Sequence, residues 1–103
     1  MGLPFKGSVS GTATSEAYNL PFRITFFTVA NKNAGVTTLN VTVTDGVDDL
    51  SIVPQNLLLN EGDMLEGSSE QIMEIGSQIK VASNALVDYF FTLENIEPTG
   101  YRY

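Results

Sequence analysis

Apolar and polar residues alternate along two segments of this chain, and this alternation constrains the fold more than any other feature. Residues 39–44 read LNVTVT, and residues 87–94 read VDYFFTLE. Successive side chains of a β-strand point to opposite faces of a sheet, so a period of two is typical of a strand with one buried face. Both segments are therefore predicted to be strands.

Shorter segments of the same kind occupy much of the remaining sequence. Turn-favouring Gly, Pro, Asn and Asp separate them at intervals of about 8–12 residues. Strands are expected at residues 20–30, 35–44, 50–53, 56–60, 64–66, 77–83 and 85–95. Residues 5–14, rich in Gly, Ser and Thr, are expected to be an edge strand or an extended arm. We therefore predict an all-β fold of about seven to nine short strands, either an antiparallel two-sheet β-sandwich of jelly-roll type, which we favour, or a small barrel.

A single domain is expected over residues 1–103, because this length and a hydrophobic content of 43% suit one core. An extended N-terminal arm over residues 1–14 and an irregular tail over residues 96–103 are compatible with it. Residues 68–75 are ambiguous, since Ser68 and Gln71 fit a helix capping box, whereas a strand here would form a hairpin with residues 77–83. We favour the strand, because so short a helix is marginal on its own.

The composition removes most catalytic chemistry. The chain has no Cys, His or Trp, so thiolate ligands, cysteine nucleophiles and the commonest general base are all missing. The chain is predicted not to be an enzyme, and no cofactor is expected. A net charge of −7 argues against nucleic-acid and anionic-membrane partners, which need a basic surface. Residues 1–6 lack the apolar run of a signal peptide, so the protein is expected to act where it is made.

Acidic residues gather at two of the predicted turns. The first turn carries Asp45, Asp48 and Asp49, and the second carries Glu61, Asp63 and Glu66. Carboxylate and carbonyl oxygens are the ligands that Ca²⁺ prefers, so these residues are candidate calcium ligands. Their spacing does not match an EF-hand loop, and Asp and Glu are also ordinary residues of solvated turns. We favour the second interpretation and predict no metal site.

Large aromatic side chains are expected on the outer faces of two strands. If Phe26 faces the core, alternation points Phe27 outward, and if Phe91 faces the core, it points Phe90 outward. An exposed aromatic ring on a strand often marks a contact with another chain. The alternatives are a small second cluster beneath a loop, or a β-bulge that shifts the alternation. The predicted interface residues are Phe27, Phe90, Tyr101 and Tyr103.

Two segments of the C-terminal half carry a recognisable combination of motifs. Residues 58–67 read LLNEGDMLEG, with an acidic turn between leucines, and residues 75–81 read IGSQIKV, a strand that begins after glycine. The last strand closes on Leu93 and Glu94. The combination resembles small virion proteins of tailed bacteriophages, which are about this length and typically lack cysteine. No functional residue is defined by these motifs, so no position inherits a role.

The resemblance implies a structural part of a virus particle that is assembled in the host cytoplasm. The leading role is a capsid decoration or cement protein that binds and stabilises the major capsid shell as a trimer or another symmetric homo-oligomer. A component of the neck, tail or fibre base is the first alternative. A carbohydrate-binding or receptor-binding module is the second, and it would use exposed rings such as Tyr18 and Tyr89.

Overall fold

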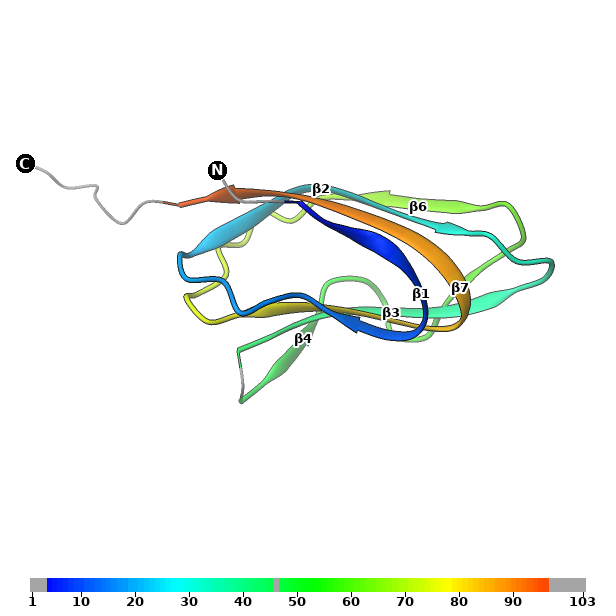
Figure 1. Cartoon of the computed structure of the whole chain (residues 1–103), viewed down its shortest axis with the longest axis horizontal. Helices are drawn as coiled ribbons and strands as arrows, with labels where there is room; N and C mark the ends of the chain where they lie inside the picture. The colour runs from blue at the N-terminus through cyan, green and yellow to red at the C-terminus, as the bar shows by residue number, and fades with distance from the viewer. Residues whose placement is uncertain (1–3, 46, 97–103) are drawn as a thin grey trace, which may run out of the picture.

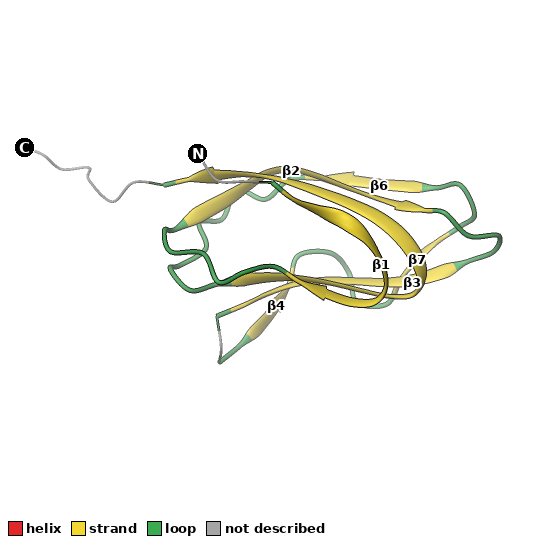
Figure 2. Ribbon diagram, in the orientation of Figure 1, coloured by secondary structure: helices red, strands yellow, loops and turns green. Residues whose placement is uncertain are grey.

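The computed structural model describes residues 4–45 and 47–96, and every strand pairing in it is antiparallel (Figure 1). The strands are β1 (Phe5–Thr14), β2 (Phe22–Asn31), β3 (Thr37–Thr44), β4 (Asp49–Ser51), β5 (Leu57–Leu59), β6 (Met64–Gly67) and β7 (Gln78–Asn95). The described residues contain no helix (Figure 2). The predicted all-β antiparallel fold is therefore confirmed. None of the described residues forms a helix long and apolar enough to cross a membrane.

The longest strand, β7, is shared by two facing layers. Its residues 87–95 pair with β2, and its residues 78–83 pair with β3. The β2 layer comprises β2, β6 and the second half of β7, whereas the β3 layer comprises β3, β4, β5 and the first half. β1 follows the other edge of β7 through the same bend, so that Phe5 lies opposite Phe91 and Thr14 opposite Lys80. Figure 1 shows the resulting curled sheet, with β2 and β6 facing β3.

The sequence predicts separate strands over residues 77–83 and 85–95, with a turn at Ser83 and Asn84 between them. This prediction is wrong, because β7 bends there without ending. The Ser83 hydroxyl donates to the carbonyl of Ala85 at 2.6 Å. The Asn84 side-chain oxygen accepts the backbone N–H of Thr38 at 3.0 Å. These side chains supply hydrogen bonds where the register with the neighbouring strands changes, so the chain passes from one layer to the other as a single strand.

Neither prediction for residues 68–75 is correct, since the segment forms no helix and no strand beyond a single β-bridge at Met73. It is attached to β2 at separate points. Met73 and Phe22 exchange two backbone hydrogen bonds of 2.7 and 3.0 Å, and Ser69 donates to the carbonyl of Ile24 at 3.0 Å. Of its apolar residues Met73 is buried, whereas Ile72 and Ile75 are exposed. Because only one of these three apolar side chains is buried, the segment shows the apolar period of neither a helix nor a strand.

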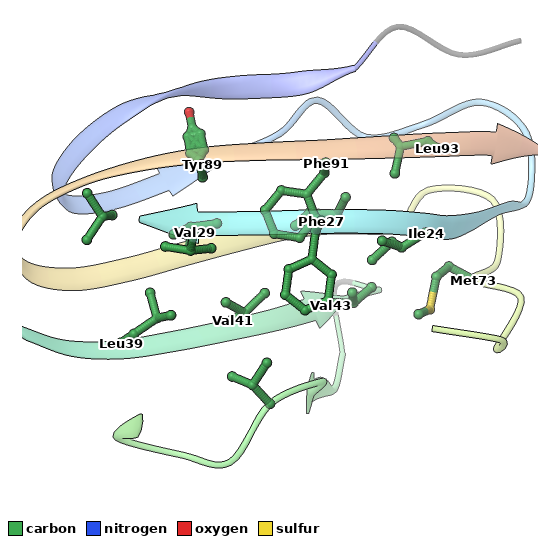
Figure 3. Packing of buried hydrophobic residues seen from close by; sticks show 14 of the residues in the cluster. Ile24, Phe27, Val29, Leu39, Val41, Val43, Met73, Tyr89, Phe91 and Leu93 are labelled. Carbon is green, nitrogen blue, oxygen red and sulfur yellow. The ribbon is translucent and has the colours of Figure 1, made fainter. Parts of the chain in front are cut away.

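The hydrophobic core fills the space between the two layers (Figure 3). Alternate residues of β2, β3 and β7 supply it, as the period of two predicts. The fully buried apolar side chains are Phe22, Ile24, Val29, Leu39, Val41, Ile79, Val81, Val87 and Phe91. β1 contributes only the half-buried Phe5, Val9 and Ala13. The edge strand is consequently held by its ladder to β7 more than by burial.

One buried polar side chain, that of Asn31, organises the end of the sandwich. Its Nδ2 lies 2.8 Å from the carbonyl oxygen of Gly35 and 3.0 Å from that of Leu59. Its Oδ1 accepts the backbone N–H of Asn33 at 2.8 Å. A buried amide satisfied in this way fixes the turn between β2 and β3 against the end of β5.

Candidate interaction surface

A β-bulge in β2 decides which phenylalanine of the pair Phe26 and Phe27 reaches the surface. The register between β2 and β7 shifts between Ile24 and Phe26, and both Thr25 and Phe26 are exposed. The prediction that Phe27 points outward is therefore wrong. Its ring is 3% exposed and stacks on Phe91 with centroids 5.0 Å apart (Figure 3). A bulge inserts one unpaired residue and reverses the alternation beyond it.

Phe26, and not Phe27 as predicted, lies on the outer face of β2. It is 45% exposed, and Phe90 on β7, predicted to face outward, is 41% exposed. Phe26 lies opposite Thr92, and Phe90 lies opposite Thr28. Met64 on β6 is also exposed and lies opposite Ala30. We call this outer side of the β2 layer the Phe26–Phe90 surface; it comprises Phe26, Thr28, Ala30, Met64 and Phe90.

Basic and acidic side chains of the same face surround this surface in balance. The Lys6 ammonium lies 5.9 Å from the centroid of the Phe90 ring, within the range of a cation–π contact. Arg23 forms an ion pair of 2.7 Å with Glu94, and Lys32 lies 3.4 Å from a carboxylate oxygen of Asp88. The chain as a whole has a charge of −7, so a nearly neutral face is a departure from its average.

Asp88 is the best-connected of these side chains. The Ser8 hydroxyl donates to its Oδ1, and Lys32 approaches its Oδ2. The hydrogen bond from Ser8 and the charge of Lys32 lower the pKa of Asp88 below its usual value, so it is ionised at neutral pH. An open hollow of about 520 Å³ lies beside it, with an apolar wall at Phe90 and Ala30 and polar groups at Lys6 and Lys32.

The first acidic turn is built on hydrogen bonds within the protein. The Asp45 carboxylate accepts the backbone N–H groups of Asp48 and Val47 at 2.9 and 2.8 Å, and these bonds lower the pKa of Asp45. Asp49 lies 3.8 Å from the ammonium of Lys80. A pocket of about 250 Å³ separates this turn from residues 71–77, with apolar lining from Val43, Leu50, Ile72 and Met73. Asp45 is therefore engaged as a turn residue, as the favoured interpretation expects.

The second acidic turn has the same character. Asp63 accepts the backbone N–H of Asn60 at 3.2 Å and closes the connection between β5 and β6. Glu66 lies on β6, opposite Thr28, and belongs to the outer face of the β2 layer. In the described ranges, 4–45 and 47–96, no three acidic side chains come together in an arrangement that suits a metal ion.

The remaining aromatic candidates are not on an exposed platform. Tyr89 is 9% exposed and packs on Phe5 with ring centroids 4.7 Å apart. Tyr18 is half-buried and meets Phe22 edge to face at 4.8 Å. Burial raises the pKa of both phenols. The other two predicted interface residues, Tyr101 and Tyr103, lie outside the described residues.

No protein-family model matches this sequence, and no curated protein matches it. The similar solved structures include a pentameric capsid protein from metagenomic phage sequences, with 15% identity and a TM-score of 0.44 over 90% of this chain. They also include the carbohydrate-binding module TmCBM61, solved with β-1,4-galactotriose, with 17% identity and a TM-score of 0.40 over 90% of this chain. The chain spans 65% of the capsid protein's length and 69% of the module's. Similarities this low carry no argument about function.

Proposed function

We propose that this chain is a structural protein of a bacteriophage particle and that it binds neighbouring virion proteins through the Phe26–Phe90 surface. The observation that carries the proposal is the exposure of two phenylalanine rings on one face of the β2 layer. Exposed aromatic rings cost free energy in water and are enriched where proteins meet. The balanced charges around them lower the repulsion that an acidic chain would otherwise meet at a contact.

The resemblance of residues 58–67 and 75–81 to virion proteins supports a place in a virus particle. Both segments can now be located in the fold. Residues 58–67 span β5, the acidic turn and β6, so they include Met64 of the proposed contact surface. Residues 75–81 span the turn at Gly76 and the beginning of β7. The leading role is a decoration or cement protein on the major capsid shell. A component of the neck, tail or fibre base would use the same kind of contact, and copy number separates the two.

The carbohydrate-binding alternative has less support. It relied on Tyr18 and Tyr89, but Tyr89 is buried against Phe5, and Tyr18 is half-buried against Phe22. The exposed rings are those of phenylalanine, which offer a stacking face but no hydroxyl group. Binding of the isolated protein to a glycan array, lost on Phe90→Ser, would favour this alternative over the virion proposal.

The first experiment measures whether the protein is part of a particle. Intact particles are purified from the source of the chain, and its copies are counted by quantitative mass spectrometry. Hundreds of copies support shell decoration, whereas six or twelve support the neck or tail. Absence from purified particles contradicts the proposal.

The second experiment tests the surface by adding purified variants to particles that lack the protein. Phe90→Ser is expected to lower occupancy at least tenfold, the effect of about 1.4 kcal/mol at a binding hot spot. Leu58→Ser is the matched control, because Leu58 is 63% exposed but lies on the β3 layer. Equal occupancy of the Phe90 variant and the unchanged protein would refute the assignment of this surface. Removal of residues 98–103 tests Tyr101 and Tyr103 in the same assay.

A further inference from the structure

The outer edge of β1 is the longest unpaired backbone edge in the described part of the chain. β1 bonds to β7 along one side, and no backbone group of residues 4–45 and 47–96 pairs with its other side. An unpaired strand edge presents N–H and C=O groups at the spacing that another strand needs. The edge is therefore a surface with a defined kind of partner, an extended chain.

The hydrogen bonds at the end of β1 show which of its residues carry the free groups. The N–H of Ser15 donates to the carbonyl of Ile79 at 2.8 Å, and the register continues this pairing. In an antiparallel ladder alternate residues bond to the partner strand, so Ala13 bonds to β7. The backbone groups of Thr12 and Thr14 consequently point to the free edge.

In the first half of β1, the hydrogen bonds on the opposite edge of β7 show which backbone groups are free. The N–H of Lys32 donates to the carbonyl of Leu86 at 3.4 Å, so the even-numbered residues of β7 in this half bond to β2. The odd-numbered residues must then bond to β1, where Tyr89 lies opposite Gly7. The backbone groups of Lys6 and Ser8 are the ones left at the free edge.

The two free segments are placed symmetrically about Ser10. Lys6 and Ser8 lie four and two residues before it, and Thr12 and Thr14 lie two and four residues after it. The register of β1 shifts between Val9 and Gly11, so the irregular stretch is itself at the centre. A second copy of the same strand, turned by a two-fold axis, therefore matches the free groups of the first.

Charge also distinguishes β1 from two of the other outer strands, β4 and β6; the third, β5, has no charged residue but is only three residues long. Copies of a chain with a charge of −7 repel one another, so a contact between copies is best placed where acidic residues are missing. β1 has ten residues, with Lys6 as its one charged side chain. The shorter β4 carries Asp49 and the shorter β6 carries Glu66. Charged side chains on an edge strand commonly prevent it from pairing with another chain, and β1 carries only one such side chain.

We propose that β1 pairs with β1 of a second copy of this chain, antiparallel and around a two-fold axis at Ser10. Lys6 then lies opposite Thr14 of the second copy, and Ser8 lies opposite Thr12 of the second copy. Each such pair exchanges two backbone hydrogen bonds. The two-fold axis keeps both bent strands concave toward the same side, so the β2 layer of one copy continues into the β3 layer of the other. The inference stands independently of the virion proposal.

The absence of cysteine from the chain makes this register directly testable. Directly opposed residues of an antiparallel pair have Cα atoms about 5.5 Å apart, within the span of a disulfide. In purified protein under mild oxidation, Ser10→Cys is expected to form a disulfide-linked dimer at least tenfold faster than Ser8→Cys. Ser8 is the matched control, because it is an exposed serine of the same strand that would face Thr12 of the second copy. Equal rates for the two variants would refute a two-fold axis at Ser10.

Amide hydrogen exchange of the unchanged protein gives a second measurement. The N–H groups of Thr12 and Thr14 are expected to exchange quickly in dilute protein and to become protected as the concentration rises. The N–H of Ala13 bonds to β7 in either state, and its protection is expected to change little. A sedimentation mass that stays monomeric at every concentration, with Thr12 and Thr14 unprotected, would overturn the proposal.

Discussion

The bulge in β2 makes a prediction that two neighbouring alanine substitutions can test. Phe27 is 3% exposed and stacks on Phe91, so Phe27→Ala is expected to lower the free energy of unfolding by about 3–5 kcal/mol. Phe26 is 45% exposed. Full burial of such a side chain contributes roughly 1.5–3 kcal/mol. Phe26→Ala is therefore expected to remove about half of this, a loss of about 1 kcal/mol. The two losses therefore differ by about 2–4 kcal/mol.

Equilibrium unfolding in urea, followed by circular dichroism, measures this difference. With an m-value of about 1–2 kcal/mol per molar for a domain of this size, the two midpoints should lie at least about 1 M apart. A small domain has only about 5–15 kcal/mol of stability, so Phe27→Leu provides a milder variant if Phe27→Ala does not fold. A loss for Phe26→Ala equal to or larger than that for Phe27→Ala would show that β2 is regular and that the bulge is wrong.

Three further substitutions, one of them with a comparison variant, test other contacts. Gly67→Ala should destabilise by about 1–3 kcal/mol in the same urea assay, because its Cβ would lie 2.8 Å from the Phe27 ring. Asn31→Ala should cost about 2–4 kcal/mol, because it removes the side-chain donor from the buried carbonyl of Leu59 and the partly buried carbonyl of Gly35, whereas Asn33→Ala should cost less. The folded pKa of Asp88 is lowered, so its stabilising effect is present above the unfolded value of about 3.9 and is lost as the pH falls through the folded value. The stability difference between the unchanged protein and Asp88→Asn should therefore shrink at low pH; a constant difference would contradict this.

Much of the fold could be predicted from local sequence, because apolar and polar residues alternate wherever a strand has one buried and one exposed face. The alternation in residues 39–44 locates β3, and the turn-favouring Asn and Gly of residues 31–35 locate the connection between β2 and β3. The bend in β7 could not be predicted from local sequence. Ser83 and Asn84 are good turn residues, but the Asn84 side-chain oxygen accepts the N–H of Thr38 in β3, and this contact forms only once β3 and β7 lie side by side.

The candidate surface was only partly predictable for the same reason. Alternation places Phe90 correctly, because β7 is regular around it. In β2 two adjacent phenylalanines allow either phase, and the phase is set by the shift in register against β7 between Ile24 and Phe26. The exposed Thr25, which donates to the carbonyl of Thr92 at 3.0 Å, is the extra residue, and no local propensity identifies it. Met64 was missed because β6 lies beside β2 only in the folded sheet.

The central position of β7 also governs when the protein can fold. Of the seven strands in the described residues it comes last, yet it pairs with β1, β2 and β3. A nascent chain emerging from the ribosome therefore holds three strands without their common partner until residues 78–95 have been synthesised. Contacts such as that between Phe5 and Phe91 close a loop of most of the chain, which is a slow step in folding. Stable folding is thus expected only after β7 has been synthesised, with the exposed strands β1, β2 and β3 in need of protection until then.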